Sequence, residues 1–484
     1  MRSKLTVLAV DLGAASGRVI AVNYDGNNLQ LKELHRFLNV PIINDGTLYW
    51  DISRLYQETK AGIEKGKALK PISIGVDAWG VDFALLDKQG VLLDNPVHYR
   101  DKRTDGMVEK VIARISKQEI YAQTGIQIMP INTLFQLSSL IEKQSAVLSH
   151  AETFLTIPDL LNYWLVGAKV CEFTNATTTQ LYNPLKKNWA ESLINILQIP
   201  YHIFPDVISP GIHLGKYDGI NVMTVAAHDT ASAVAAVPAE INNFAYISSG
   251  TWSLVGQEIA TPLINESALK ANITNEGGVF GTFLFLKNVM GLWLIQECKR
   301  QWQNEGENYT SGDLVNLARQ EPPVRSLILP DDPQFLHQGN FPQLIANFCK
   351  MTSQPEPTTP GTVVRCVLDS LALDYKNVIE KLVGISNRPV ELIHVVGGGS
   401  QNDLLNQLTA NATGLPVLAG PAEATVLGNA IVQLITLGEL KNLSEARQIV
   451  ARMKGIKRYE PKDSALWDEA YQRFLTLQKQ FKIW

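Results

Sequence analysis

The chain is poor in cysteine, and its cysteines are not spaced for a metal site. Four cysteines in 484 residues are too few for a disulfide scaffold, and no Cys-x-x-Cys pair indicates structural zinc. We expect buried or inert thiols. The spacing of Cys349 and Cys366 would allow a bridge, but sequence alone does not show whether their Cβ atoms meet.

Long apolar runs and basic blocks are also missing. No window of 18 apolar residues occurs, and the apolar stretch at 283–295 is interrupted by Lys287. The apolar run before Asp11 is too short for a signal-peptide core. With a formal net charge of −4 and no run of five Lys or Arg residues, the sequence indicates neither a nucleic-acid nor a membrane partner. We expect a cytoplasmic protein acting on small molecules, and oligomeric state is not readable from the sequence.

The common nucleotide-binding motifs are absent. There is no G-x-x-x-x-G-K-[ST] loop, no G-x-G-x-x-G turn and no His-Arg-Asp catalytic loop of the protein-kinase type. If the protein binds a nucleotide, it therefore uses another arrangement of backbone and side chains.

What is present is the composition of a folded α/β protein. Hydrophobic residues make up 45% of the chain and charged residues 19%, and 484 residues suffice for two large domains or three smaller ones. Apolar strand patterns alternate with helical ones over short connections, which predicts an α/β fold. A polar connector at 239–243 predicts a boundary that divides the chain into domains 1–240 and 241–484.

The stretch at 4–22 reads as strand, small-residue tip and strand. Apolar runs at 5–10 and 19–22 flank a tip in which Gly13 and Gly17 permit unusual backbone conformations. Small residues between the glycines would let a bulky anion reach main-chain N–H groups, and Asp11 could face a metal-bound phosphate. The alternative is an ordinary hairpin whose glycines serve only the turn.

A similar pattern recurs at 244–256, where an apolar strand, a small-residue tip and a second apolar run follow one another. A repeat at half the chain length suggests two similar domains, although strand-turn-strand units also recur by chance. Three glycines at 397–399 follow the strand predicted at 392–396, and Ser400 with Asp403 fits a capping box just after them. Backbone dipoles at such a helix start favour anions.

Asp229 is the best candidate for a catalytic residue. It follows a buried strand at 222–227 and stands in the first turn of an alanine-rich helix, between His228 and Thr230. A carboxylate there could deprotonate an alcohol during phosphoryl transfer. The alternative is that Asp229 only caps the helix.

Seven segments together resemble the FGGY family of carbohydrate kinases, in order and over about residues 5–440. They are Asp-Leu-Gly-Ala-Ala-Ser-Gly-Arg at 11–18, Gly-Val-Asp-Ala-Trp-Gly-Val-Asp at 75–82, Ala-His-Asp-Thr-Ala-Ser-Ala at 227–233, Ser-Gly-Thr-Trp-Ser-Leu at 249–254, Asn-Glu-Gly-Gly at 275–278, Leu-Lys-Asn-Val-Met-Gly-Leu-Trp-Leu at 286–294 and Val-Gly-Gly-Gly-Ser-Gln-Asn at 396–402. The resemblance implies two actin-like, ribonuclease H-like α/β domains around a central cleft. It also implies ATP and Mg²⁺ and phosphorylation of L-rhamnulose at its C1 hydroxyl.

The resemblance further implies a role for individual positions. Asp229 would be the general base, Asp11 would help to hold magnesium, and the apolar ring of Trp79 could pack on the methyl group of a deoxy sugar. The expected nucleotide contacts are Ala14, Ala15, Ser16, Gly17, Arg18, Thr251, Gln296 and Gly398. The expected sugar contacts are Trp79, Gly80, His228, Asp229, Thr230 and Asn288. Arg18 could equally be a surface cation or a structural partner.

Two other functions remain open at this stage. A kinase for another ketose, such as L-fuculose or L-xylulose, would need the same base and the same phosphate contacts. An actin-like ATPase without sugar kinase activity would share the two hairpins, but it would not need the cluster at 228–230 or the tip at 79–80.

Overall fold

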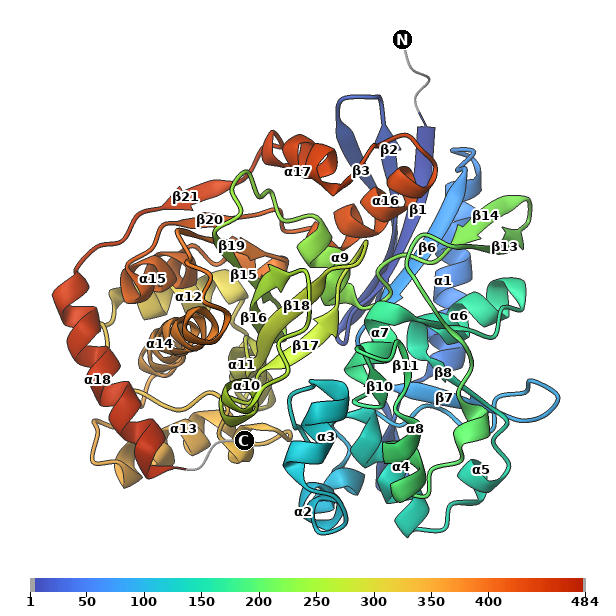
Figure 1. Cartoon of the computed structure of the whole chain (residues 1–484). Coiled ribbons are helices and arrows are strands. Elements are labelled where there is room, and N and C mark those ends of the chain that lie inside the picture. Colours follow the sequence, from blue (N-terminus) through green and yellow to red (C-terminus); the bar gives the residue numbers. More distant parts are fainter. Residues whose placement is uncertain (1–4, 482–484) are drawn as a thin grey trace. The chain divides into compact units, whose positions relative to one another are not determined.

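The computed structural model describes residues 5–481, which form two compact units, each with its own sheet and helices (Figure 1). Within the described residues, unit 1 comprises 5–240, 258–285 and 423–453, and unit 2 comprises 241–257, 286–422 and 454–481. The prediction of an α/β protein with two domains is confirmed.

The units differ from the predicted division into 1–240 and 241–484. The chain leaves unit 1 at 240, as expected, but it returns there twice. Helix α16 (Ala424–Thr436) gives the physical reason for the second return. Asn429 Nδ2 donates to the carbonyl of Gly75 at 3.2 Å, and Gln433 Nε2 donates to the carbonyl of Leu8 at 3.0 Å. These buried amides attach α16 to the sheet of unit 1. Local sequence patterns do not show such a tertiary contact.

Unit 1 is built on a six-stranded sheet in the order β13-β14-β6-β1-β2-β3. Strands β1 and β2 form the expected hairpin, β2 and β3 pair antiparallel, and β1, β6 and β14 run parallel to one another. Their bounds are β1 Leu5–Leu12, β2 Ser16–Tyr24, β3 Leu29–Leu38, β6 Ser73–Ala78, β13 His213–Tyr217 and β14 Ile220–Met223. Parallel pairing places the carboxyl ends of β1 and β6 side by side, with Asp11 opposite Asp77.

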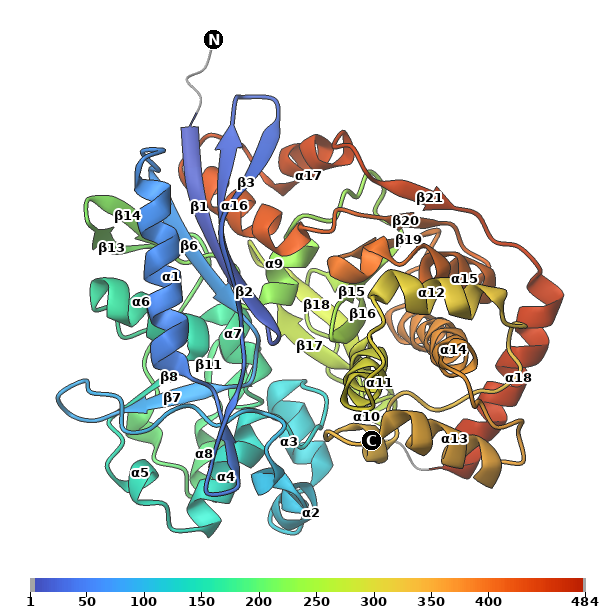
Figure 2. The same cartoon turned by 180° about the vertical axis from the view of Figure 1, so that it is seen from behind.

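Two helices cover opposite faces of this sheet. Helix α1 (Ile52–Lys67) lies along one face of the sheet (Figure 2). It packs closely there because Gly62 and Gly66 leave room for the side chains of Val19 and Leu8. Helix α16 lies against the other face, because a Cβ added to Gly75 would meet the side chains of Asn429 and Gln433 in this helix. Leu8 and Gly75 face opposite sides of the sheet. Gly75 pairs with Ala9, and the side chains of neighbouring residues such as Leu8 and Ala9 point to opposite faces of a strand.

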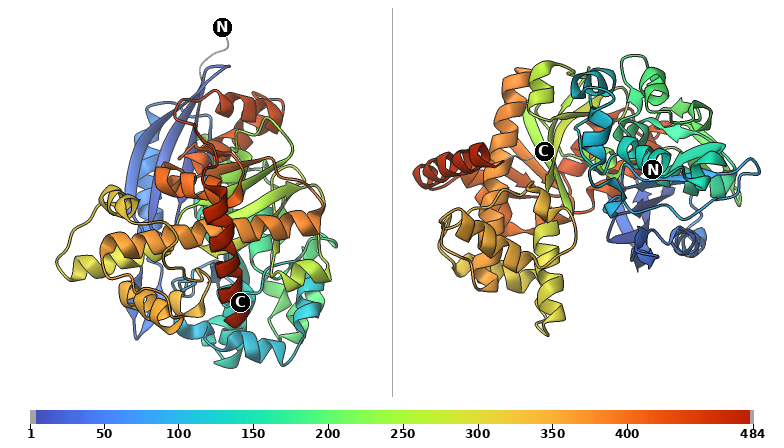
Figure 3. Two further views of the ribbon diagram at one scale, coloured as in Figure 1. Left: turned by 90° about the vertical axis from the view of Figure 1, so that its left-hand side faces the viewer. Right: turned by 90° about the horizontal axis from the view of Figure 1, so that it is seen from below.

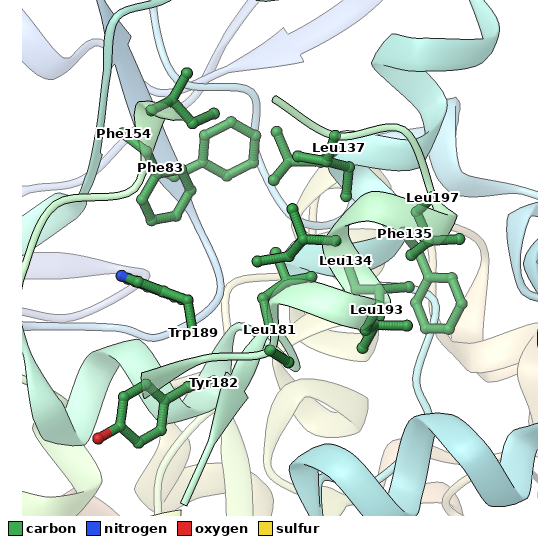
Figure 4. Close-up of a cluster of buried hydrophobic side chains, with 14 of the residues drawn as sticks. Phe83, Leu134, Phe135, Leu137, Phe154, Leu181, Tyr182, Trp189, Leu193 and Leu197 are labelled. Carbon is green, nitrogen blue, oxygen red and sulfur yellow. The ribbon is translucent and has the colours of Figure 1, made fainter. Parts of the chain in front are cut away.

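The rest of unit 1 is a mostly helical region with its own apolar core. Figure 4 shows part of this core, in which aromatic and leucine side chains from β7, α4, β8 and α8 converge. The helices of unit 1 besides α1 and α16 are α2 Met107–Ile112, α3 Lys117–Thr124, α4 Thr133–Glu142, α5 Ala146–Ser149, α6 Ile157–Val166, α7 Phe173–Thr178, α8 Glu191–Ile196, α9 Asp229–Ala235, α10 Glu266–Lys270 and α17 Leu443–Ala451. The short strands are β4 Ile42–Asn44, β5 Thr47–Tyr49, β7 Phe83–Leu86, β8 Thr153–Thr156, β9 Cys171–Glu172, β10 Tyr182–Asn183, β11 Asn188–Trp189, β12 Val207–Ile208 and β17 Thr274–Gly277.

Six strands of the second, seven-stranded sheet follow the order β18-β16-β15-β19-β20-β21. These strands are β15 Phe244–Ser249, β16 Trp252–Ile259, β18 Phe283–Met290, β19 Leu392–Val396, β20 Val417–Ala419 and β21 Lys457–Tyr459. The order repeats that of unit 1 strand for strand: an antiparallel hairpin, a parallel neighbour, a second parallel neighbour and an antiparallel edge. The predicted duplication is confirmed.

Helices of unit 2 include the longest in the described chain, α14, which is buried along most of its length. In the left view of Figure 3 it is the long orange helix, crossed by the dark red α18. The helices are α11 Trp293–Asn304, α12 Ser311–Gln320, α13 Phe341–Met351, α14 Pro360–Ser386, α15 Asp403–Thr413 and α18 Ser464–Gln480.

Two predictions from composition can be compared with this fold. All four cysteines are buried free thiols, so Cys349 and Cys366 do not form a bridge. Among residues 5–481, no helix is long and apolar enough to cross a membrane.

Candidate functional site

The tip of the first hairpin presents backbone to the surface. Asn39 holds the tip from one side, because its N–H donates to the carbonyl of Ala15 at 3.0 Å and its Nδ2 donates to the carbonyl of Gly13 at 3.1 Å. Ala15 is exposed, and Ala14 and Ser16 are half-buried. In the described chain, no hydrogen bond is made by the N–H groups of Ala14 and Ala15, so both can donate to an anion.

Gly17 has a different function in the structure. It is buried, and a Cβ at this position would collide with the ring of Phe37 and with the side chain of Leu12. This glycine is therefore required by packing below the tip, which is neither the phosphate contact nor the turn conformation that the sequence suggested for it. A nucleotide contact by Gly17 stays a prediction.

Arg18 lies at the base of the same hairpin and pairs with two carboxylates of unit 1. Its Nε and Nη2 both contact Oδ2 of Asp11, at 2.8 and 2.7 Å, and its Nη1 pairs with Glu423 at the start of α16. The structure thus gives Arg18 the role of a structural partner. Glu423 was not among the predicted residues, because nothing in the sequence connects it to the hairpin.

Three aspartates gather at the carboxyl ends of the parallel strands of unit 1. Asp11 ends β1, Asp77 lies opposite it in β6, and Asp229 begins α9. Burial, and then the charge of Asp11, raise the pKa of Asp77 well above its usual value. Asp77 Oδ2 accepts a hydrogen bond from Asn429 at 2.6 Å, while its buried Oδ1 accepts none in the described chain. Such crowded carboxylates favour a bound cation.

Asp229 is the first residue of α9, and His228 occupies the N-cap position without a side-chain capping bond. The capping alternative for Asp229 is therefore wrong. Its side chain is 29% exposed. Burial raises the pKa of Asp229 to about 6, against the opposing effect of His228. The carboxylate is thus within reach of a ligand and ionised at neutral pH.

His228 lies between two carboxylates. Its Nε2 is 3.5 Å from Oδ1 of Asp229, and its Nδ1 is 3.3 Å from Oε2 of Glu276 in β17. Burial lowers the pKa of His228, but the carboxylates around it, Glu276 first and then Asp229 and Glu172, together outweigh burial and leave that pKa above its usual value. Thr230, predicted beside the sugar, is buried, and its hydroxyl lies 3.4 Å from Oδ1 of Asp229.

Trp79 and Gly80 lie beside this cluster. The N–H of Ala78 donates to the carbonyl of Ala227 at 2.9 Å, so the two strand ends are joined just before Trp79 and His228. Asp82 fixes the aromatic residues, because its Oδ2 accepts from Nε1 of Trp50 at 2.6 Å and from Nε1 of Trp79 at 3.0 Å. The structure therefore brings together Trp79, Gly80, His228, Asp229 and Thr230.

The second hairpin tip, in unit 2, is closely packed by glycines. Cβ atoms at Gly397 and Gly399 would collide with Ser249, and one at Gly291 would collide with Ser253. Gly398, by contrast, is exposed and has open space where its Cβ would be. Of the three glycines after β19, Gly398 is thus the exposed one, and its contact with the nucleotide stays a prediction.

The remaining predicted nucleotide residues also lie in unit 2. Trp293 N–H donates to the carbonyl of Thr251 at 3.0 Å, which ties the hairpin to the start of α11, and Gln296 is exposed on that helix. The predicted capping box at Ser400 is wrong, since Asn402 caps α15 by accepting from the N–H of Leu405.

Asn288, predicted beside the sugar, lies in β18 of unit 2. The other five predicted sugar residues belong to unit 1, so the structure does not place Asn288 in their cluster. Its contact with the sugar stays a prediction.

Several residues of the site were missed by sequence reasoning. Asp77, Asp82 and Glu276 all lie inside segments that carried the family resemblance, so their positions were available, but no local pattern distinguishes a buried carboxylate from a surface one. Their common signal is an acidic residue next to glycine, alanine or valine.

A divalent cation would find carboxylates here but no ready-made cage. In residues 5–481, no group of three His, Cys, Asp or Glu side chains is arranged to hold a metal ion. Mg²⁺ usually takes one or two carboxylates together with water and substrate phosphates, so the pair Asp11 and Asp77 fits such a cation.

Comparison with known proteins agrees with this arrangement. The family model described as "FGGY family of carbohydrate kinases, N-terminal domain" matches residues 6–226, and the corresponding C-terminal domain model matches residues 245–437. Together the two models cover most of the chain.

Full-length relatives are also found. The chain is 44% identical to a rhamnulokinase of Bacteroides thetaiotaomicron, over 97% of this chain and 99% of that protein, and 44% identical to a rhamnulokinase of Oceanobacillus iheyensis, over 92% and 96%. Its fold matches the crystal structure of a xylulose kinase from Lactobacillus acidophilus, with a TM-score of 0.81 at 17% identity over 98% of both chains. The chain belongs to the FGGY family of carbohydrate kinases, for which ATP is a substrate.

Proposed function

We propose that the protein phosphorylates L-rhamnulose at its C1 hydroxyl, with ATP as the phosphoryl donor. The observation that carries the proposal is the full-length similarity, at 41–44% identity, to proteins named rhamnulokinase. The cluster around Asp229 adds a chemical reason, since it offers a reachable carboxylate beside hydrogen-bonding groups suited to a hydroxylated ligand.

Asp229 acts as the general base in this proposal. It is ionised at neutral pH and accepts the proton of the C1 hydroxyl at its carboxylate as the oxygen attacks phosphorus. His228, paired with Glu276, lies beside Asp229 and is suited to hold the carboxylate in place. Thr230 and the backbone of Gly80 then complete the hydrogen-bonding surface for the sugar.

The backbone N–H groups of Ala14 and Ala15 bind phosphate oxygens in the same proposal. Asp11 and Asp77 would hold Mg²⁺, which neutralises phosphate charge when it is bound. Arg18 keeps Asp11 in place through its ion pair and is itself held by Glu423. Thr251, Gln296 and Gly398 are further proposed contacts for the nucleotide.

Trp79 is the proposed contact for the methyl group of the deoxy sugar. Its indole is only 5% exposed and is held by Asp82, so it offers a small, rigid apolar surface. A ketose without the methyl group would lose this contact, which is worth on the order of 1 kcal/mol for one methyl group. This difference favours L-rhamnulose over L-xylulose.

A coupled assay of ADP release over a panel of ketoses tests the proposal. The panel contains L-rhamnulose, L-fuculose and L-xylulose with a control lacking sugar, and NMR of the product identifies the phosphorylated carbon. We expect the highest kcat/KM with L-rhamnulose and a 1-phosphate product.

Each alternative function gives a different result in this assay. Highest kcat/KM with another ketose would replace the substrate but keep the kinase. ADP release that does not depend on sugar would favour an actin-like ATPase and would contradict the proposal.

A further inference from the structure

The short helix α7 and the residues that flank it are polar and yet fully buried. Glu172, Thr174 and Asn175 are 0% exposed, and Thr177 and Thr178 are 1% and 4% exposed. Buried polar side chains are costly unless they are hydrogen-bonded, so their partners indicate why they are there. Thr177 accepts from the N–H of Gly277, whereas the other four bond to backbone groups of the segments that form the proposed sugar site.

The first set of bonds reaches the segment that carries Asp229. Glu172 Oε2 accepts from the N–H of Ala227 at 3.1 Å, and Thr174 Oγ1 accepts from the N–H of His228 at 3.0 Å. Thr174 in turn donates its hydroxyl proton to Glu172 Oε2 at 2.5 Å. The backbone just before Asp229 is therefore held at two successive residues.

Asn175 joins this segment to the turn at Trp79. Its Nδ2 lies 3.3 Å from the carbonyl of Trp79 and 3.3 Å from the carbonyl of Ala227. One side-chain amide thus connects the two segments that carry Asp229 and the proposed contact for the methyl group.

Thr178 holds the next residues of the turn. Its Oγ1 accepts from the N–H of Val81 at 3.0 Å, and its side chain fills the space where a Cβ on Gly80 would lie. Val81 has a φ of 66°, and the N–H of Asp82 donates back to the carbonyl of Gly80 at 2.9 Å. A hydrogen bond that spans one residue of positive φ marks a rare and strained γ-turn, which persists only where its surroundings enforce it.

We propose that α7 is the positioning element of the sugar site, and that Thr178 is a positioning residue which holds the strained turn at Gly80 and Val81 against the sugar. The inference rests on the proposed function, because it takes the segments at 79–81 and 227–229 as the sugar site. It assigns to Thr178 no contact with the reacting atoms.

Thr178→Val tests the proposal, because valine keeps the shape of threonine but cannot accept the N–H of Val81. Thr179→Val is a matched control. Both threonines are buried, and each donates its hydroxyl to a carbonyl three residues back, Thr178 to Asn175 and Thr179 to Ala176. Thr179, however, accepts from the N–H of Leu181, which lies outside the segments of the proposed sugar site. Steady-state KM for sugar and for ATP, kcat and Tm are measured for both variants and for Thr178→Ser, using the ketose that wild-type enzyme turns over fastest.

We expect Thr178→Val to raise the KM for sugar on the order of tenfold, the effect of about one lost hydrogen bond, with the KM for ATP unchanged. Thr179→Val should lower Tm similarly and leave both KM values near wild type. Thr178→Ser, which keeps the acceptor, should restore most of the sugar affinity.

Equal sugar KM in the two valine variants, a parallel rise of both KM values in Thr178→Val, or no recovery with serine would overturn the proposal. If a valine variant does not fold, Thr178→Ala and Thr179→Ala give the same comparison. If the wild-type enzyme prefers a ketose other than L-rhamnulose, only the proposed substrate is overturned, because the KM values of the variants are then compared with that ketose. Failure of wild type to phosphorylate any sugar would overturn both.

Discussion

Nδ1 of His228 lies 3.3 Å from Oε2 of Glu276, on the far side of the imidazole from Asp229. The ring therefore stands between an almost fully buried carboxylate and one that a ligand can reach. This order suits the two acidic groups to different functions in the proposed reaction: Glu276 to support the histidine, and Asp229 to meet the substrate.

Replacement of Asp229 by asparagine should abolish most phosphoryl transfer. Asparagine keeps the size of aspartate but cannot accept the proton, and a general base contributes about a hundredfold to ten-thousandfold to the rate. We expect kcat to fall by a factor in this range while Tm stays near the wild-type value, as measured by the ADP-release assay and by thermal unfolding. Near-normal turnover in a folded Asp229→Asn variant would rule out this residue as the base.

The pH dependence of the reaction should report the same carboxylate. Because the pKa of Asp229 is raised to about 6 and only the ionised form can take the proton, kcat/KM for the sugar should fall as pH drops through about 6. Below that point the fall should approach tenfold per pH unit. Constant kcat/KM down to pH 5 would mean that another group accepts the proton.

Gly17 should matter for stability more than for nucleotide binding. Valine at this position would press against Phe37 and Leu12 below the hairpin, and overpacking of this kind typically costs about 1–3 kcal/mol. We expect Gly17→Val to lower the free energy of unfolding in urea by about this amount. A variant of wild-type stability would show that the hairpin can shift to make room.

Ala15 is the better position at which to test the phosphate contacts. It is exposed at the hairpin tip, so a valine there can block access to the backbone without disturbing the core. Ala15→Val should raise the KM for ATP severalfold and leave the KM for sugar near wild type. Ala61→Val, an equally conservative change at an exposed position of α1, serves as control. Equal changes in both KM values would contradict a phosphate-binding tip.

Glu172 should make stability depend on pH. Burial raises its pKa in the folded protein to about 8, from an ordinary value of 4.5, and burial also raises the pKa of neighbouring Asp159 to about 7. Between pH 4.5 and pH 8, folded Glu172 holds a proton that the unfolded chain has lost. The contribution of Glu172 to stability is therefore full below about pH 4.5, falls as pH rises and is lost above about pH 8. Glu172→Gln should reduce the loss of Tm between pH 5 and pH 8. An unchanged difference would show that Glu172 is ionised in the fold throughout.

Much of the fold could be predicted from the sequence, since it lies in local patterns. The apolar runs around the tips at 13–17 and 250–251 predicted both hairpins, and their likeness predicted the duplication. Asp229 could be identified because it follows a buried strand and begins a helix.

Other features depend on tertiary contacts and leave little local trace. The run of threonine and asparagine at 174–179 has no apolar period, so nothing in it signals a buried helix. Gly17 could not be assigned to packing without knowledge that Phe37 lies beside it. Glu423 and Asn429 are far in sequence from the hairpin and the strand that they contact.

The late position of α16 in the chain has a consequence for synthesis on the ribosome. Strands β1 and β6 are made early, but the helix that satisfies the carbonyls of Leu8 and Gly75 begins only at Ala424. During translation the area of the sheet that α16 covers therefore stays open while residues 286–422 of unit 2 emerge. A nascent chain stalled before residue 424 should be open to proteases over this area, whereas release of the complete chain closes it.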